Sequence, residues 1–224
     1  MRRMESCDKH HMSDSVLNLQ LCDGAQSTDR ANIKRLPFTV EHVRMPKSVG
    51  FDFKWAGQSG YLALHDIVLS DARIACDDKT PMRMLDLRRT LTFLPRGVRA
   101  HGWGETIRRA NAFTLLYFDQ DWLSDELEIA PQQRLLQPAI YFQSPALLQH
   151  MDKLARLARA RPPVSRLMAD SLALLAGAEL EGHYVSVVGH LQDLLLQEHE
   201  RPVDAADDPV DHAFLFRQDR KSVV

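Results

Sequence analysis

Two strand-like segments separated by a turn, between Leu85 and Phe118, constrain the fold of this chain most strongly. From Leu85 to Phe93 the odd positions are apolar except for Arg89, and the even positions are polar. Because side chains alternate across a β-strand, this period predicts a half-buried strand. Arg89 interrupts the apolar face, which indicates a bend, a bulge or a hydrated rim.

A turn and a second strand follow in the sequence. At residues 95–97 the order Pro-Arg-Gly predicts a turn, with proline at its second position and glycine at its fourth. Residues 112–118 are apolar at nearly every position, which predicts a strand covered on both faces. We expect the Gly-Trp-Gly sequence at 102–104 to form a loop of a small antiparallel barrel.

Several further short strands are predicted upstream, joined by segments rich in Gly, Pro and Asp. They are residues 38–43, 51–55, 61–69 and 72–76. Short, closely spaced strands of this kind are typical of an antiparallel barrel or sandwich.

The apolar period lengthens to that of a helix after Asp119. Helices are predicted at residues 121–127, 144–158, 163–178 and 185–200. Asp121 is expected to cap the first helix, and Ser144 followed by Pro145 is a strong start for the second. Gly182 is expected to separate the last two helices.

Composition limits the class of protein and its expected location. The chain of 224 residues has 45% hydrophobic and 26% charged residues and a net charge of −2. A net charge this close to zero creates no overall electrostatic field that would attract the chain to nucleic acid or to a membrane surface. The three cysteines have no CxxC spacing, and no apolar run approaches the roughly 18 residues of a membrane span. We therefore expect a cytoplasmic protein without membrane contact.

These patterns divide the chain into four regions. Residues 1–32 are expected to form a mobile tail, and residues 33–120 an antiparallel barrel. Residues 121–200 would form a helical linker region, and residues 201–224 an unstructured, acidic and turn-rich tail. The predicted fold class is α+β, an antiparallel barrel followed by amphipathic helices.

The sequence resembles the sensor half of AraC-type transcriptional regulators. The resemblance covers roughly residues 36–181. The segments that carry it are Tyr61–Asp66, Leu85–Arg88, Leu91–Gly97, Ala110–Asp119 and the helix at Leu172–Leu180.

This resemblance implies that residues 33–120 form a cupin-like barrel that senses a small molecule. It also implies that residues 121–200 are a dimerisation region, whose helices pair two copies. In the family, two helix-turn-helix units come next and read DNA. No segment after residue 182 offers paired helices with a basic recognition face. We therefore expect a chain truncated before its DNA-binding half, which argues against direct specific DNA binding. Frameshift, truncation and a genuine stand-alone sensor remain open explanations.

A ligand pocket inside the barrel is the main candidate site, because such pockets combine apolar walls with a few polar groups. The candidate residues are Trp55, Tyr61, His65, Phe93, Trp103 and Tyr117. The competing interpretation is that these side chains simply fill the barrel as core.

The helical stripes suggest a dimer interface. The candidate residues are Leu147, Met151, Leu154, Leu167, Leu172 and Leu175. Such stripes could also pack only on the barrel. The basic residues Lys153, Arg156, Arg159, Arg161 and Arg166 are interpreted as a solvated face rather than a DNA contact.

The sequence contains no positive sign of catalysis. Metal-binding cupins are similar to one another in a His-x-His followed by Glu, whereas His65 and His101 stand apart here. We predict no metal, no cofactor and no catalytic residues. A two-histidine, one-carboxylate site assembled across strands remains the alternative.

The sequence therefore favours the effector-sensing and dimerising part of an AraC-type regulator. Its expected partners are a small-molecule effector and either a second copy or a full-length relative. A small cupin-type metal-dependent enzyme is the alternative, and a nonfunctional fragment is a third interpretation.

Overall fold

A computed structural model describes residues 17–22, 28–35, 37–77, 80–129, 137–160 and 165–199. The side chain of Arg35 is not included, and those of the last helix are described from Leu167 to His183. The strands are β1 (Asn18–Leu21), β2 (Asp29–Arg35), β3 (Phe38–Met45), β4 (Gly50–Trp55), β5 (Gly60–Asp66), β6 (Leu69–Cys76), β7 (Thr90–Leu94), β8 (Ala100–Thr106), β9 (Asn111–Phe118) and β10 (Ala139–Phe142). The helices are α1 (Gln120–Glu126), α2 (Pro145–Arg159) and α3 (Arg166–His199).

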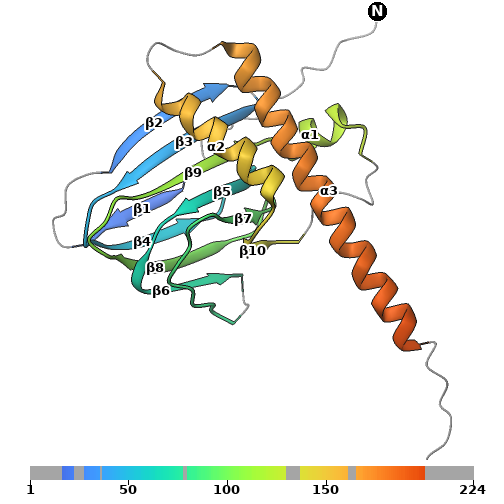
Figure 1. Cartoon of the computed structure of the whole chain (residues 1–224), viewed down its shortest axis with the longest axis horizontal. Helices are drawn as coiled ribbons and strands as arrows, with labels where there is room; N and C mark the ends of the chain where they lie inside the picture. Colours follow the sequence, from blue (N-terminus) through green and yellow to red (C-terminus); the bar gives the residue numbers. More distant parts are fainter. Residues whose placement is uncertain are drawn as a thin grey trace, which may run out of the picture. The chain divides into compact units, whose positions relative to one another are not determined.

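The strands form two antiparallel sheets (Figure 1). One has four strands in the order β1-β4-β8-β6, and the other has six in the order β10-β7-β5-β9-β3-β2. This is the expected cupin-like α+β fold. The sheets are not closed into a barrel, however, because every strand pairing among the described residues lies within one sheet or the other. Contacts that involve side chains, rather than strand pairing, join the two sheets among the described residues.

Strand alternation divides the interior into two cores on either side of the six-stranded sheet. In β9, Leu115 and Tyr117 face the four-stranded sheet, whereas Leu116 and Phe118 face the helices. Helix α2 covers the second face above β2, β3, β5 and β9 (Figure 1). The prediction that this strand is covered on both faces is confirmed.

The segment expected to be one strand from Leu85 to Phe93 is two segments. Residues 82–87 follow the edge of the four-stranded sheet, where the Leu69 amide donates to the Leu85 carbonyl at 2.8 Å. Strand β7 belongs to the six-stranded sheet. Arg89 lies between them with φ of 57°. Of the bend, bulge or hydrated rim predicted at Arg89, the structure has a bend, at the point where the chain changes sheets.

The Gly-Trp-Gly segment was expected to form a loop, and this prediction is wrong. Gly102, Trp103 and Gly104 lie within β8, a central strand of its sheet. A Cβ atom at Gly102 would meet the Arg73 carbonyl oxygen at 2.2 Å and the Phe53 ring at 2.7 Å. The glycines therefore serve close packing within the sheet rather than a turn.

The turn after β7 is confirmed, although its register differs from the prediction. The Val98 amide donates to the Pro95 carbonyl at 3.2 Å, so proline is the first residue of the turn. Gly97 is then the third residue, and its φ of 85° is a conformation that glycine adopts without steric cost.

The helix starts are set by caps, one of which was assigned to the wrong residue. The Asp119 carboxylate, not that of Asp121, caps α1 by accepting from the Asp121 amide at 2.9 Å. Ser144 caps α2 as expected and accepts from the Leu147 amide at 3.4 Å. Gly182 does not end a helix, because α3 continues through it to His199.

The N-terminal region contains more structure than was expected. Strand β1 and the start of β2 lie within residues 1–32, which were assigned to a mobile tail. Described residues up to Val187 form one compact unit that includes both sheets, and those from Val188 belong to a second. The acidic segment at 201–224 lies outside the described residues. None of the described helices has the length and apolarity that crossing a membrane requires.

Candidate functional site

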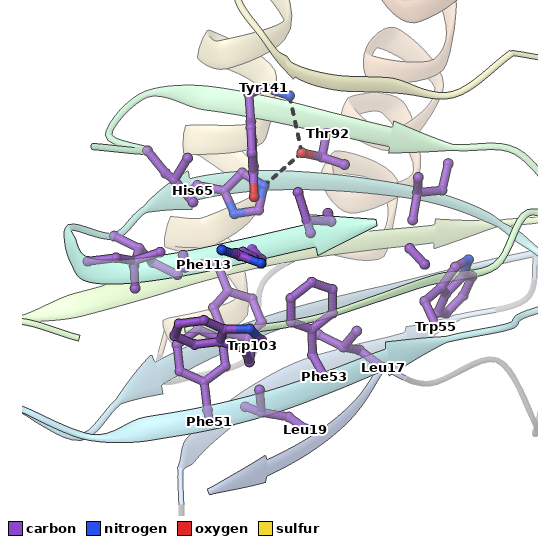
Figure 2. Close-up of a pocket in the computed structure, with 18 of the residues that line it drawn as sticks. Leu17, Leu19, Phe51, Phe53, Trp55, His65, Thr92, Trp103, Phe113 and Tyr141 are labelled. Carbon is purple, nitrogen blue, oxygen red and sulfur yellow. Dashed lines mark hydrogen bonds between the residues drawn. The ribbon is translucent and has the colours of Figure 1, made fainter. Parts of the chain in front are cut away.

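A cavity of about 60 Å³ lies between the two sheets (Figure 2). Its walls are almost entirely apolar. The lining residues are Leu17, Leu19, Phe51, Phe53, Trp55, Tyr61, His65, Ile67, Leu69, Ala72, Arg73, Ile74, Leu87, Thr92, Leu94, Ala100, Trp103, Phe113 and Tyr141. Because the cavity exceeds the roughly 10–15 Å³ that one water needs, it has room for a small guest.

Three polar side chains meet at one wall of the cavity. His65 Nε2 lies 3.0 Å from the Thr92 hydroxyl, and the Tyr141 amide donates to the same hydroxyl at 3.5 Å (Figure 2). The rings of His65 and Tyr141 meet edge to face with centroids 5.8 Å apart. A hydroxyl has one hydrogen and two lone pairs, so Thr92 can accept from Tyr141 while it donates to His65. The wall is therefore ordered before any ligand arrives.

Burial keeps this wall uncharged at neutral pH. Desolvation lowers the pKa of His65 to about 4, so its imidazole is neutral. Desolvation also raises the pKa of Tyr61 and of Tyr141, which keeps both phenols protonated. Arg73 is the one lining residue of the cavity that carries a charge, and it is exposed. The interior therefore suits an uncharged guest with few polar atoms.

An aromatic cluster forms another part of the wall. The Trp55 ring stacks on Tyr117 with centroids 5.5 Å apart and contacts Tyr61 at 4.9 Å. Trp55 Nε1 is buried and has no hydrogen-bond partner among the described residues. A buried donor without a partner is uncommon and is available to a ligand acceptor.

Four of the six residues predicted for the pocket line the cavity: Trp55, Tyr61, His65 and Trp103. Trp103 is 39% exposed, so it contributes at the outer edge.

The other two predicted pocket residues, Phe93 and Tyr117, do not line the cavity. Phe93 packs on Phe118 in the core beneath the helices, because alternation in β7 turns Thr92 rather than Phe93 toward the other sheet. Tyr117 lies behind Trp55, where its hydroxyl donates to Glu41 Oε2 at 3.2 Å. Both are core residues, as the competing interpretation proposed.

Sequence reasoning missed several lining residues. Leu17 and Leu19 were assigned to the N-terminal tail, and Tyr141 to a connecting segment. The alternation of Leu17, Leu19 and Leu21 was a weak strand signal in a polar region. The position of Thr92 could have been found by assigning the polar face of β7 to the pocket.

The predicted dimerisation residues fall into two groups. Leu147, Met151, Leu154 and Leu172 are buried in the core between the helices and the six-stranded sheet. That placement corrects their assignment to an exposed interface. Leu167 and Leu175 are exposed by 74% and 48%, and Met168 beside them by 51%. An exposed apolar patch on α3 therefore remains.

The two histidines considered as metal ligands lie on different sheets. His65 belongs to β5 and is held by Thr92, whereas His101 is exposed on β8. In the described stretches, no three His, Cys, Asp or Glu side chains are grouped so that they could hold a metal ion.

No protein-family model matches the chain, and no curated protein matches it significantly. Similar solved structures include an AraC-like activator and cupin proteins. The AraC-like transcriptional activator CuxR matches with a TM-score of 0.50 and 8% identity over 75% of this chain and 61% of that chain. ToxT from Vibrio cholerae gives a TM-score of 0.48 at 8% identity, covering 67% and 58%. The Cnp3 cupin domain of Schizosaccharomyces pombe gives 0.33 at 16%, covering 50% and 76%.

The likeness to CuxR is one of fold, since the two sequences are almost unrelated. This chain spans less than two thirds of the length of that activator. Fold alone does not determine function, so the function has to be argued from the cavity and the surface of α3.

Proposed function

We propose that this chain is the effector-sensing and dimerising part of a cytoplasmic AraC-type transcriptional regulator. The cavity between the sheets is the observation that carries this proposal. It combines an apolar wall with the ordered group of His65, Thr92 and Tyr141. Sensor pockets need this combination, because apolar area provides affinity and a few polar atoms orient the ligand.

The size of the cavity limits the effector. Pockets for drug-sized ligands usually measure roughly 300–1,000 Å³, whereas this cavity measures about 60 Å³. The effector is therefore a very small, largely apolar molecule, or its binding moves part of the wall. Strand β1 is one part of the wall suited to move, because it has four residues and, among the described strands, pairs with β4 alone.

A ligand screen with a matched pair of variants tests this function. Molecules that raise the melting temperature of the native chain would be tested again on Phe53→Trp and Phe142→Trp, because a native-state ligand stabilises its protein. Both phenylalanines are half-buried, but only Phe53 lines the cavity. We expect the larger ring to abolish the shift at position 53 and to preserve it at position 142. A panel without any stabilising molecule, or equal loss in both variants, would contradict the proposal.

Pairing of two copies is the second part of the proposal. Leu167, Met168 and Leu175 form an exposed apolar surface on α3, which a second copy or a full-length relative could cover. An effector would act by changing the geometry of this helical interface. The proposal assigns no DNA-reading role to the described residues.

The proposal includes no catalytic step. The alternative function, a small cupin-type metal-dependent enzyme, requires a stoichiometric metal that depends on His65 or His101. Metal analysis of purified, chelator-washed protein and of His65→Gln distinguishes the two functions. Stoichiometric iron, zinc or manganese that is lost in the variant would favour the enzyme.

A further inference from the structure

A second hollow, separate from the cavity between the sheets, lies on the opposite face of the six-stranded sheet. It has a volume of about 430 Å³ and opens between α2 and the ends of β3, β5 and β9. His42, Arg44 and Lys47 contribute from β3 and the turn after it, and Arg159 contributes from the last turn of α2. We call this hollow the α2 groove.

The cations of the α2 groove are not neutralised by the protein. Arg44, Lys47 and Arg159 are exposed, and none of them forms an ion pair within the described part of the chain. The groove also contains two carboxylates, Asp66 and Asp152. Each of them forms an ion pair with an arginine, which offsets its negative charge.

Each carboxylate of the groove is paired with an arginine that does not line it. Arg109 Nη2 lies 2.9 Å from Asp66 Oδ1, and Arg89 Nη1 lies 3.5 Å from Asp152 Oδ2. The groove and these two partners together therefore carry a surplus of positive charge. Like charges gathered in a concave site focus a field that attracts anions.

His42 gives the groove a polar floor. It is buried, and its Nδ1 lies 3.0 Å from the Thr114 hydroxyl. Its Nε2 has no hydrogen-bond partner in the part of the chain that the structure describes. If the Thr114 hydroxyl donates to Nδ1, the ring hydrogen lies on Nε2 and is available to an acceptor in the groove.

The cations lie close enough to this histidine to affect its titration. The pKa of His42 is lowered to about 4, mainly by desolvation and then by the charges of Arg159 and Arg44, while the charge of Asp29 opposes them. The imidazole is thus neutral when the groove is empty. The guanidinium groups of Arg44 in β3 and Arg159 in α2 therefore both lower the pKa of the buried His42 imidazole.

The local folding explains why these groups meet. Alternation along β3 places His42 and Arg44 on the face that α2 covers, next to the buried Val40. Asp152, Ala155 and Arg159 line the groove from one side of α2. Arg159 Nε donates to the Ala155 carbonyl at 3.1 Å, which holds the guanidinium at the end of the helix.

We propose that the α2 groove binds a small phosphate-bearing molecule. Arg44 and Arg159 would donate hydrogen bonds to the phosphate oxygens, and His42 would donate one from the floor of the groove. A guanidinium group donates two parallel hydrogen bonds to a phosphate, and a phosphate has enough oxygens for two such groups. Lys47 would add a point charge at the rim. A concave site with a buried floor suits a small ligand better than it suits the convex backbone of duplex DNA.

Calorimetry with the full chain tests this proposal directly. Inorganic phosphate and pyrophosphate would be titrated at constant ionic strength, and random-sequence duplex DNA would be titrated separately. Arg44→Gln and Arg159→Gln each remove one positive charge from an exposed position, so both variants should fold. Lys54→Gln, at an exposed position of β4 in the other sheet, removes the same charge elsewhere and is the control.

We expect saturable pyrophosphate binding that weakens about tenfold in each arginine variant and less than about twofold in the control. Absence of saturable binding of either anion, or equal weakening in all three variants, would overturn the proposal. DNA binding that is lost in the arginine variants and that excludes pyrophosphate would assign the groove to a nucleic-acid backbone instead, which also overturns it.

Discussion

The backbone amide of Leu17 donates a hydrogen bond of 3.1 Å to the hydroxyl of Tyr117, 100 residues further along the chain. The same hydroxyl donates to Glu41 Oε2 at 3.2 Å, and Glu41 pairs with Arg30 at 3.1 Å. Leu17 immediately precedes β1 and lines the cavity. One buried phenol therefore connects a wall of the candidate ligand site to the six-stranded sheet.

Replacement of Tyr117 by phenylalanine should destabilise the fold and loosen β1. The change leaves the Leu17 amide and the Glu41 carboxylate without this partner, and an unsatisfied buried group costs about 1–3 kcal/mol. Urea unfolding measures the loss, and hydrogen exchange of the β1 amides locates it. Tyr61→Phe is the control, because the Tyr61 hydroxyl has no hydrogen-bond partner among the described residues. Equal losses in the two variants would contradict the assigned role of the hydroxyl.

Acid should destabilise the protein through two buried histidines. Burial lowers the pKa of His42 and of His65 to about 4 in the folded state, from 6.5 in the unfolded chain. Between these values the unfolded chain binds protons that the folded chain does not, so stability falls as pH falls from 6.5 toward 4. We expect the double variant His42→Gln/His65→Gln to lose less stability than the native protein between pH 7 and pH 5. The exposed His101 supplies the control His101→Gln, and an unchanged slope in the double variant would refute the prediction.

Glu181 should have the opposite pH dependence. Its Oε2 is buried without a hydrogen-bond partner among the described residues, and desolvation raises its pKa to about 7 from 4.5. The favourable burial of the neutral Glu181 carboxyl is fully present below pH 4.5, and this stabilisation is lost as pH rises through 7. Glu181→Gln, which cannot ionise, should therefore be more stable than the native protein at pH 8, by about 1–3 kcal/mol. At pH 4.5 the two proteins should unfold at similar temperatures in calorimetry, and a gain of equal size at both pH values would argue against ionisation as the cause.

Two glycines of α3 should respond in opposite directions to alanine. A Cβ atom at Gly182 meets no described residue within 4 Å, so Gly182→Ala should stabilise the helix by about 0.5–1 kcal/mol. A Cβ atom at Gly177 would lie 2.4 Å from Leu123 Cδ1. Gly177→Ala should therefore destabilise the packing of α3 on α1, by about 1–3 kcal/mol. Urea unfolding of the two variants compares the effects, and stabilisation by both would show that α3 does not pack on Leu123.

The proposed dimer should depend on the exposed residues of α3 rather than on the buried leucines of α2. Leu167→Arg and Leu175→Arg place a charge on the apolar patch, so either change should shift the mass measured by light scattering from dimer to monomer. Ile107→Arg, at a position 37% exposed outside the patch, should leave the mass unchanged. A native protein that is monomeric at all concentrations would remove the dimer from the proposed function.

The sequence predicted the features that depend on neighbouring residues. Ser144 and Pro145 predicted the start of α2 because a cap needs only a side chain and the amides that follow it. The continuous apolar run of β9 predicted a strand buried on both faces. The break at Arg89 was predicted as a bend, a bulge or a hydrated rim for a similar reason, since one residue violated the alternation. The resemblance carried by the segments between residues 36 and 181 predicted the cupin-like fold.

The tertiary structure decided what each apolar face touches. Alternation in β7 shows that Phe93 and Thr92 lie on opposite faces, but both faces meet a core, so the pattern cannot tell which one meets the cavity. The four buried residues assigned to a dimer interface, which are Leu147, Met151, Leu154 and Leu172, are likewise apolar whether a sheet or a second copy covers them. Leu17, Leu19 and Tyr141 reach the cavity only because distant strands bring them there, and the α2 groove joins β3 to a helix more than a hundred residues later. Local sequence determines the period of a segment, because period follows from backbone geometry, whereas the partner of each face depends on contacts between segments that are far apart in the chain.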